Sequence, residues 1–380
     1  GRGAAQTQAH LHFSAGYGHE HQDTLAVMLY AAGEELLPDL GDARFTYRGW
    51  STTTLSHNTV VVDGATQRAD AQTGGNLTAW FPVANGCGAV EAEGHRSYPV
   101  CREYRRALVL VQAPPDHVFV LDIFKVVGGH QHDWIACGSA DYDQTATVNA
   151  PLRRVADSLA ADGRLRIPMT TVEQTSRGLR SEFDQPGEVS QYWANLRQPH
   201  VAERSAPWVV DFRPTAPGRA GLRLHLLAPT DGQLHLVEAP SLRRAGSNTA
   251  EAERYQMPMV VWRRQGEDLS SRFVAVWEPC PGGESWVADV AVVSSTPEGL
   301  AVKVTDREHR EWWLLWGEQP TSTITAGLCR LTGRFGCLAC EPGRPAEGHL
   351  MAGTLLEGPA GTLGLPPALA LPLQDAGTDP

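Results

Sequence analysis

Side chains that could bind a metal ion are concentrated in the stretch from Gly16 to Gly64. They are the two histidines of an H-E-H sequence, His19 and His21, followed by Asp39 and then His57. Two imidazoles and a carboxylate form a ligand set that suits zinc and leaves one coordination position for water. A buried Asp39 without a cation or hydrogen-bond donors would be costly. We therefore predict a zinc site formed by His21, Asp39 and His57.

The spacing of histidines alone does not identify a ligand. The chain has 14 histidines, and His10/His12 and His130/His132 repeat the H-x-H spacing. His130, His132 and Asp133 offer a second possible cluster, but a Gly-Gly pair precedes them and an apolar run follows, which favours a corner between a loop and a strand. The first group differs because its carboxylate ends an otherwise apolar run.

The elements that must position the predicted ligands are read as β-strands. Side chains two residues apart point to the same face of a strand, so His19, His21 and Asp23 would share one face. The run LAVMLYAAGEELLPDL is apolar on both sides of Gly33, which predicts two buried strands joined there, with Asp39 at the end of the second. SHNTVVVDG predicts a third strand that opens with its histidine. Three adjacent strands would bring the ligands to a common point.

Short strand patterns continue along the chain and are separated by its 38 glycines and 26 prolines. ALVLV and VFVLDIF predict a hairpin closed at Pro114 and Pro115, and Asp122 inside it requires a partner, for which Arg106 is the candidate. GLRLHLLA and QLHLVEAP flank an Asp-Gly turn, and QMPMVVWRR is expected to pair with SRFVAVWEP. The pattern predicts an all-β fold, a large antiparallel β-sandwich of the supersandwich type.

Composition sets the domain organisation and excludes several functions. We predict a sandwich domain over residues 1–345 and a poorly ordered Gly/Pro-rich tail over residues 346–380. A net charge of −11 argues against nucleic-acid binding, and no run of eighteen apolar residues suggests a membrane span. Phosphate-binding loops, nucleophile elbows and H-E-x-x-H motifs are absent from the sequence. The seven cysteines lack the second C-x-x-C that a zinc ribbon needs, so structural cysteines are the better interpretation.

The motifs H-x-H-x-D, Y-A-x-G, L-L-P-D-L-G and S-H-N-T-V-V-V-D-G resemble the start of the β-sandwich region of the heparinase II/III-like polysaccharide lyases. Weaker similarity continues over roughly residues 10 to 290. The resemblance implies that zinc is held by the second histidine of H-x-H, the aspartate and the later histidine, which are His21, Asp39 and His57. It also implies that His19 faces the sugar-binding cleft.

Members of this family carry a helical toroid before the sandwich, and the toroid supplies a tyrosine and a histidine as acid and base. This sequence enters the sandwich motifs directly after GRGAAQTQAH. We therefore expect either the C-terminal portion of a longer lyase, whose partner is a missing N-terminal toroid domain, or a protein without the chemistry. The resemblance also implies a periplasmic or secreted protein.

The implied reaction is β-elimination on a uronic-acid polysaccharide, in which the sugar carboxylate is neutralised and a base removes the neighbouring proton. His19 could bind the carboxylate or act as that base, while the metal orients it. Arg44 and Arg48 offer local positive charge for an acidic substrate, although both also fit as ordinary strand-edge arginines. Tyr47 could line the same cleft or simply pack in the core.

Two other classes of function remain open from the sequence. A non-catalytic carbohydrate-binding sandwich would keep the metal for stability and would bind acidic glycans without cleaving them. A cupin-like metal oxygenase would also be all-β with an H-x-H pair. Cupins need a glutamate a few residues after that pair, and Leu25 and Ala26 stand there instead.

Overall fold

The computed structural model describes residues 6–13, 21–41, 48–68, 73–84, 86–161, 163, 173–175, 178–180, 189–245, 251, 254–344, 346–359 and 361–364. Within these ranges nearly all regular structure is β-strand, and the exceptions are the short helix α1 (Arg48–Thr52), short 3-10 turns and a single helical residue, Glu251. The all-β prediction is confirmed. No helix of the described part has the length and apolar character that crossing a membrane requires. The chain divides into two compact units, residues 1–285 and residues 286–380.

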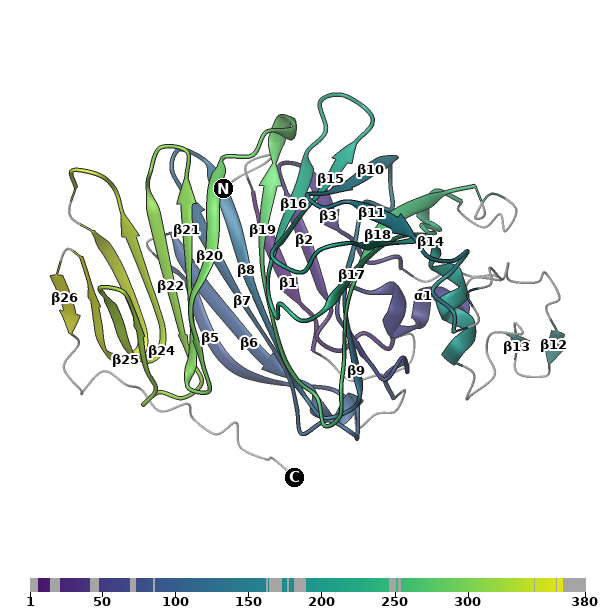
Figure 1. Cartoon of the computed structure of the whole chain (residues 1–380), viewed down its shortest axis with the longest axis horizontal. Coiled ribbons are helices and arrows are strands. Elements are labelled where there is room, and N and C mark those ends of the chain that lie inside the picture. The colour runs from purple at the N-terminus through teal and green to yellow at the C-terminus, as the bar shows by residue number, and fades with distance from the viewer. Residues whose placement is uncertain are drawn as a thin grey trace. The chain divides into compact units, whose positions relative to one another are not determined.

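The first unit contains two large antiparallel sheets (Figure 1). The larger has eight strands in the order β10 (Gln144–Val148), β15 (Trp208–Pro214), β16 (Gly221–Ala228), β19 (Ser270–Cys280), β8 (His117–Val127), β7 (Glu103–Ala113), β6 (Cys87–Glu93) and β5 (Asn76–Ala84). The smaller has six strands in the order β11 (Leu152–Arg154), β14 (Arg197–Ala202), β17 (Gln233–Pro240), β18 (Gln256–Gln265), β9 (Gln131–Cys137) and β4 (Val60–Val62). A three-stranded sheet of β1 (Gln8–Leu11), β2 (Val27–Ala31) and β3 (Glu34–Leu37) and the pair β12 (Glu173–Thr175) and β13 (Gly178–Arg180) complete the unit.

The main core lies between the inner faces of the two large sheets and is rich in tryptophan. Trp134 and Trp262 come from the smaller sheet, while Trp208 and Phe273 come from the larger. The ring of Trp262 meets each of the other three edge-on, at centroid distances between 5.1 and 6.2 Å. Edge-to-face aromatic pairs add roughly 0.5–1.5 kcal/mol beyond the burial of their area. This aromatic cluster therefore fixes the two sheets face to face.

A second core covers the opposite face of the smaller sheet. Trp50 of α1 and Leu55 of the following 3-10 turn pack there against Val61, Ile135 and Val261. Figure 1 shows α1 on the side of the smaller sheet that faces away from the larger one. Both faces of the smaller sheet are therefore buried around its centre, which explains the continuous apolar runs VVV of β4, WIAC of β9 and MVVW of β18.

Two hairpins form as the sequence predicts. β2 and β3 pair across Ala32 and Gly33, which both have positive φ, at 52° and 82°. That combination is the backbone of the tight turns that match the twist of a hairpin. β7 and β8 pair over their whole length across the turn at Pro114 and Pro115. Both connections are local, so alternation and turn residues were sufficient to predict them.

The predicted pairing of β18 with β19 is wrong, because the two strands belong to different sheets. The strands that flank the Asp-Gly turn, β16 and β17, also belong to different sheets. Each linker carries the chain from one sheet of the sandwich to the other. β18 and β19 are buried on both faces over most of their length, so their apolar pattern does not specify whether the next strand pairs beside them or packs opposite.

The second unit is one antiparallel sheet, and its described strands continue past residue 345, where the sequence analysis ended the sandwich domain. Its strands are β20 (Val287–Thr296), β21 (Gly299–Asp306), β22 (Glu311–Gly317), β24 (Cys329–Cys340), β25 (Glu347–Gly358) and β26 (Gly361–Gly364), with β23 (Thr323–Ala326) beside β24. β25 and β26 occupy residues predicted to be a tail. Leu356 of β25 is fully buried against Leu331 and Leu338, so these Gly-rich residues are ordered by sheet pairing and a small core.

Candidate metal centre

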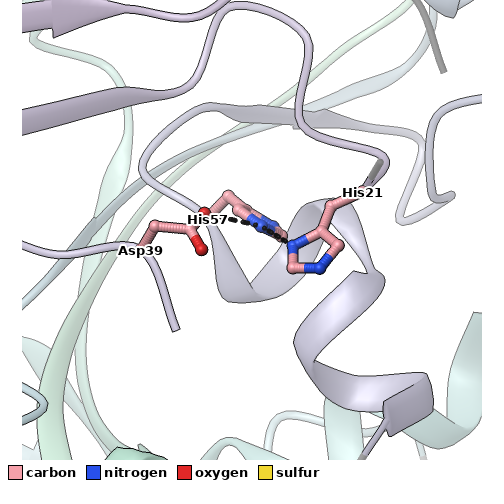
Figure 2. A group of neighbouring side chains, drawn as sticks. All are labelled: His21, Asp39 and His57. Atoms are coloured by element: carbon pink, nitrogen blue, oxygen red, sulfur yellow. Dashed lines mark hydrogen bonds and ion pairs between the residues drawn. The ribbon is translucent and has the colours of Figure 1, made fainter. Parts of the chain in front are cut away.

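Side chains of His21, Asp39 and His57 converge on one point (Figure 2). The Nε2 atom of His57 lies 3.1 Å from Nδ1 of His21 and 3.1 Å from Oδ2 of Asp39. One ligand atom from each residue lies within 4.8 Å of the others. Tetrahedral zinc with ordinary bond lengths places neighbouring ligand atoms about 3.3 Å apart. The three donors therefore fit a small divalent metal ion, and no other such group occurs in the described ranges.

His57 is held in the orientation that a metal ligand needs. It is 1 % exposed, and its Nδ1 atom lies 2.7 Å from the carbonyl oxygen of Thr53. A carbonyl oxygen only accepts hydrogen bonds, so Nδ1 carries a proton and donates it. In the neutral ring, Nε2 then presents its lone pair toward His21 and Asp39. Fixing one ring nitrogen by a backbone carbonyl is the common way to orient a ligating histidine.

Asp39 is held as a carboxylate at the other side of the group. Its Oδ1 atom accepts a hydrogen bond from the backbone N–H of Gly41 at 2.7 Å, which leaves Oδ2 for His57. Burial acts to raise the pKa of Asp39, but the hydrogen bond and charge of His57 together with the Gly41 N–H hold that pKa well below its usual range. Burial acts to lower the pKa of His57, and Asp39 raises it overall. The group thus supplies an anionic ligand.

The ligands do not lie on three adjacent strands, as the sequence suggested. His21 and Asp23 lie in irregular chain, Asp39 lies two residues beyond β3, and His57 follows a 3-10 turn and precedes β4. β3 and β4 also belong to different sheets. The extended pattern fails at Leu25, whose φ of +63° turns the chain back before β2 begins. Loop ends therefore supply all three candidate ligands, and strands only anchor those loops.

Asn58 joins the anchoring strands to the metal group, a role that the sequence analysis missed. Its side chain is 2 % exposed and makes three hydrogen bonds to backbone. Nδ2 donates to the carbonyl oxygens of Val27 at 3.1 Å and Pro38 at 2.9 Å, and Oδ1 accepts from the N–H of Cys137 at 2.7 Å. Because Pro38 precedes Asp39, Asn58 ties the segment that carries this ligand to β2 and β9. Its position next to His57 was the only signal in the sequence.

A buried ion pair supports the same region from the core. Arg106 and Asp122 form the predicted pair through two parallel hydrogen bonds of 2.8 Å, and Trp134 donates to the same carboxylate at 3.0 Å. Arg106 also donates to the carbonyl oxygens of Leu25 at 2.9 Å and Asn58 at 2.6 Å. Arg106 and Asp122 are at most 1 % exposed. The guanidinium therefore fixes the backbone on both sides of the metal group while every charge is satisfied.

A small cavity of about 30 Å³ adjoins the group and is lined by His12, Asp23, Asp39 and His57, among others. Its size suits a single water molecule. Nε2 of His12 lies 3.4 Å from Oδ1 of Asp23. The group therefore has room beside it for the coordination position that three protein ligands leave open.

Four other predicted site residues cannot be placed. His19, Arg44 and Tyr47 lie outside the described residues. Arg48 begins α1, but its side chain also falls outside what the structure describes.

The second histidine cluster is the predicted corner from loop to strand. β9 begins at Gln131, directly after His130. Both ring nitrogens of His132 are engaged, Nδ1 with the Ser271 hydroxyl and Nε2 with the Gly128 carbonyl, each at 2.7 Å. Asp133 accepts a hydrogen bond from Arg263 instead of facing the histidines. All seven cysteines are free thiols, so the structure shows neither a ribbon nor a disulfide framework.

The chain is a large antiparallel β-sandwich protein with a histidine–aspartate–histidine group. Residues 5–186 match the family model described as "Heparinase II/III-like, C-terminal", which confirms the resemblance predicted from the motifs. Residues 5–186 are thus similar to the C-terminal region of the heparinase II/III-like family. No match was found among curated proteins.

Solved structures with a similar fold include heparinases. Heparinase III, the BT4657 gene product, shares 13 % identity at a TM-score of 0.51, covering 83 % of this chain and 40 % of that one. A second structure, named Heparinase III, shares 12 % identity at a TM-score of 0.50, covering 81 % and 39 %. Heparan sulfate lyase HepC from Pedobacter heparinus shares 13 % at a TM-score of 0.49, covering 80 % and 38 %. The chain therefore spans about two-fifths of the length of these proteins.

Proposed function

We propose that this chain is the β-sandwich part of a polysaccharide lyase that acts by β-elimination on a uronic-acid-containing polysaccharide. The observation that carries the proposal is the meeting of His21, Asp39 and His57 inside the segment that matches the heparinase II/III-like model. The similarity to the heparinase II/III-like family model and to heparinase structures supports the reaction class. The three converging donors supply a reason for the motif residues to be present.

We propose zinc as the metal held by His21, Asp39 and His57. Two imidazole nitrogens, one carboxylate oxygen and an adjacent cavity of about 30 Å³ match a four-coordinate ion with one water ligand. When bound, zinc would cross-link the loop ends that carry its ligands and supply local positive charge. The surrounding residues do the remaining work, since Thr53 orients the His57 ring and Gly41 orients the Asp39 carboxylate.

The substrate side of the site is proposed from residues that flank these ligands. His19 lies two residues before His21, so a fixed His21 limits where His19 can reach. We assign His19 to the sugar carboxylate or to removal of the proton beside it. Arg44, Tyr47 and Arg48 lie in the segment between the second and third ligands, and two guanidinium groups there would offset the repulsion between an acidic polymer and a chain of net charge −11.

The complete reaction needs an acid and a base on opposite sides of the scissile bond. We propose that a helical toroid domain supplies them, as the resemblance implies, and that the chain functions in the periplasm or outside the cell. Under this proposal the 380-residue chain alone releases little or no unsaturated uronate from heparan sulfate, alginate or related polymers.

Metal analysis tests the proposal directly. Protein purified without added metal and then dialysed against zinc should hold one equivalent, measured by plasma mass spectrometry. Asp39→Asn and His21→Ala should lose it, whereas His132→Ala, which removes a buried histidine outside the group, should retain it. Zinc content that is equal in all four proteins would refute the assignment. Strong lyase activity of the isolated chain would instead refute the need for groups from another domain.

A further inference from the structure

A cleft opens at the edge of the first unit, where the two large sheets end. The edge strand of the larger sheet is β10 and that of the smaller sheet is β11, and only three residues separate them. β10 also lies against β18 across the sandwich. The cleft between them has a volume of about 390 Å³. Clefts of roughly 300–1,000 Å³ are the size that holds small ligands.

The lining of this cleft combines polar and apolar side chains. Leu236, Met257 and Pro258 form apolar lining. The polar lining consists of three amides, a hydroxyl, an imidazole and a carboxylate, from Gln144, Gln198, Gln256, Thr145, His200 and Glu238. Among the described lining residues Glu238 is the only acidic side chain, and none is lysine or arginine. Such a surface offers many hydrogen bonds. Its one negative charge faces the cleft, while Arg197, which lies opposite Glu238 on β14 and interacts with it, does not line the cleft.

The backbone is irregular where the cleft residues Gln198 and Glu238 meet. The register between β14 and β17 shifts between Arg197 and His200, which marks a bulge. Gln198 within it has a φ of +50°, and its side-chain Nε2 donates to Oε2 of Glu238 at 3.3 Å. Positive φ is uncommon for residues other than glycine because it is sterically unfavourable, and bulges commonly re-aim a side chain at a functional site. The bulge directs an amide to the carboxylate at this cleft.

We propose that this cleft binds a neutral pyranose unit, either free or within a polysaccharide. Each sugar hydroxyl can both donate and accept a hydrogen bond. An amide N–H beside a carboxylate oxygen can therefore donate to one hydroxyl and accept from the adjacent one. The apolar C–H face of the ring would rest on Leu236 and Pro258. Glu238 would repel a uronate, because a like charge near a carboxylate is unfavourable. This site is separate from the metal group and does not depend on the lyase assignment.

The test compares two ligands that differ only at one carbon, methyl β-glucopyranoside and methyl β-glucuronide. Binding to the full chain is followed by saturation-transfer NMR and by titration. A single sugar of this size should bind with a Kd on the order of 1–10 mM, and the glucuronide should bind at least threefold more weakly. A neutral β-linked trisaccharide distinguishes a free sugar from a unit of a polysaccharide. Tighter binding of the trisaccharide than of the pyranoside indicates a polysaccharide chain, and equal binding indicates a single sugar.

Two variants locate the site. Gln198→Asn shortens the amide but keeps a residue that tolerates positive φ, and it should weaken pyranoside binding roughly 3- to 10-fold. Glu238→Gln should reduce the preference for the neutral sugar. Gln233→Asn, an exposed glutamine of β17 outside the cleft, is the matched control and should change nothing. The proposal would be overturned if no pyranoside bound at a concentration 20-fold above the expected Kd. It would also be overturned if Gln198→Asn bound the pyranoside as tightly as the parent and Glu238→Gln kept the parent's preference for the neutral sugar. Asp39→Asn should leave the sugar affinity unchanged, so loss of the metal site cannot be mistaken for loss of this one.

Discussion

Replacing Asn58 with alanine should weaken both the fold and the metal site. The substitution removes three hydrogen bonds to backbone groups that are buried around a side chain only 2 % exposed. A hydrogen bond contributes about 0.5–1.5 kcal/mol net, and a buried group left without a partner costs about 1–3 kcal/mol. Three such bonds give a loss of about 2–4 kcal/mol in the free energy of unfolding. This loss should appear in the metal-free protein.

The effect on the metal should be separate and additional. Without Asn58 the carbonyl of Pro38 is no longer tied to β2 and β9, so the adjacent Asp39 loses its fixed position. Removing groups that orient a metal ligand typically lowers metal affinity 10–100-fold. We therefore expect the zinc Kd of Asn58→Ala to rise by that factor, as measured by competition with a chromophoric chelator below the unfolding temperature.

The control for this prediction is Asn149→Ala. Asn149 is an exposed asparagine whose Oδ1 accepts one hydrogen bond, from the N–H of Val209 at 2.9 Å. The Asn149→Ala substitution should lower the free energy of unfolding by at most about 1 kcal/mol and leave the zinc Kd unchanged. The reasoning fails if Asn58→Ala destabilises the metal-free chain no more than this control does. It also fails if the zinc Kd of Asn58→Ala stays within twofold of the parent value.

Three further predictions concern the charged groups of the first unit. Asp122→Asn leaves Arg106 buried with an incomplete partner and should lower the free energy of unfolding by about 3–5 kcal/mol in urea titrations; a loss below 1 kcal/mol would contradict the importance of the pair. Burial, followed by a nearby arginine, lowers the pKa of His235 to about 4 in the folded protein. The unfolded chain therefore binds more protons between pH 6.5 and 4, so stability should fall as the pH is lowered through that window, by about 3 kcal/mol from this residue. His235→Leu should flatten that part of the pH profile, and a profile parallel to that of the parent would exclude the residue as its source. Zinc at a hundredfold excess over Kd should add about 2.7 kcal/mol to the parent and nothing to Asp39→Asn, as read from the shift of the melting temperature with zinc concentration.

Local interactions explain which parts of the fold were predictable. The β2–β3 and β7–β8 hairpins depend on apolar runs that flank short turns, and both turns lie at residues that stand out in the sequence, Gly33 and the Pro114–Pro115 pair. Asp122 stood out as a carboxylate inside an apolar strand, and Arg106 pairs with it as the cost of burying a lone charge requires. Each inference needed only a short stretch of chain.

Long-range packing decided the features that the sequence left undetermined. β16 and β19 belong to one sheet, and β17 and β18 belong to the other. An apolar strand can pair with the next strand in its own sheet or pack against it from the opposite sheet, so its sequence does not decide between these two arrangements. Within the predicted tail, the Gly-rich residues of β25 gain order by pairing with β24, whereas residues 365–380 lie outside the described residues. The cleft at the sheet edges likewise exists only because β10 and β11 end their sheets side by side.

The amino-acid sequence by itself determined that this protein is all-β, which family it resembles and which three side chains could hold a metal. These properties follow from residue type and from periodicity along the chain. Tertiary structure alone decided that the ligands sit on loop ends instead of adjacent strands, and that Asn58 and Arg106 hold those loops. The physical reason is that these hydrogen bonds join a side chain to backbone groups 20 to 81 positions away, and the pairing of whole sheets, which no local pattern encodes, brings the two partners together.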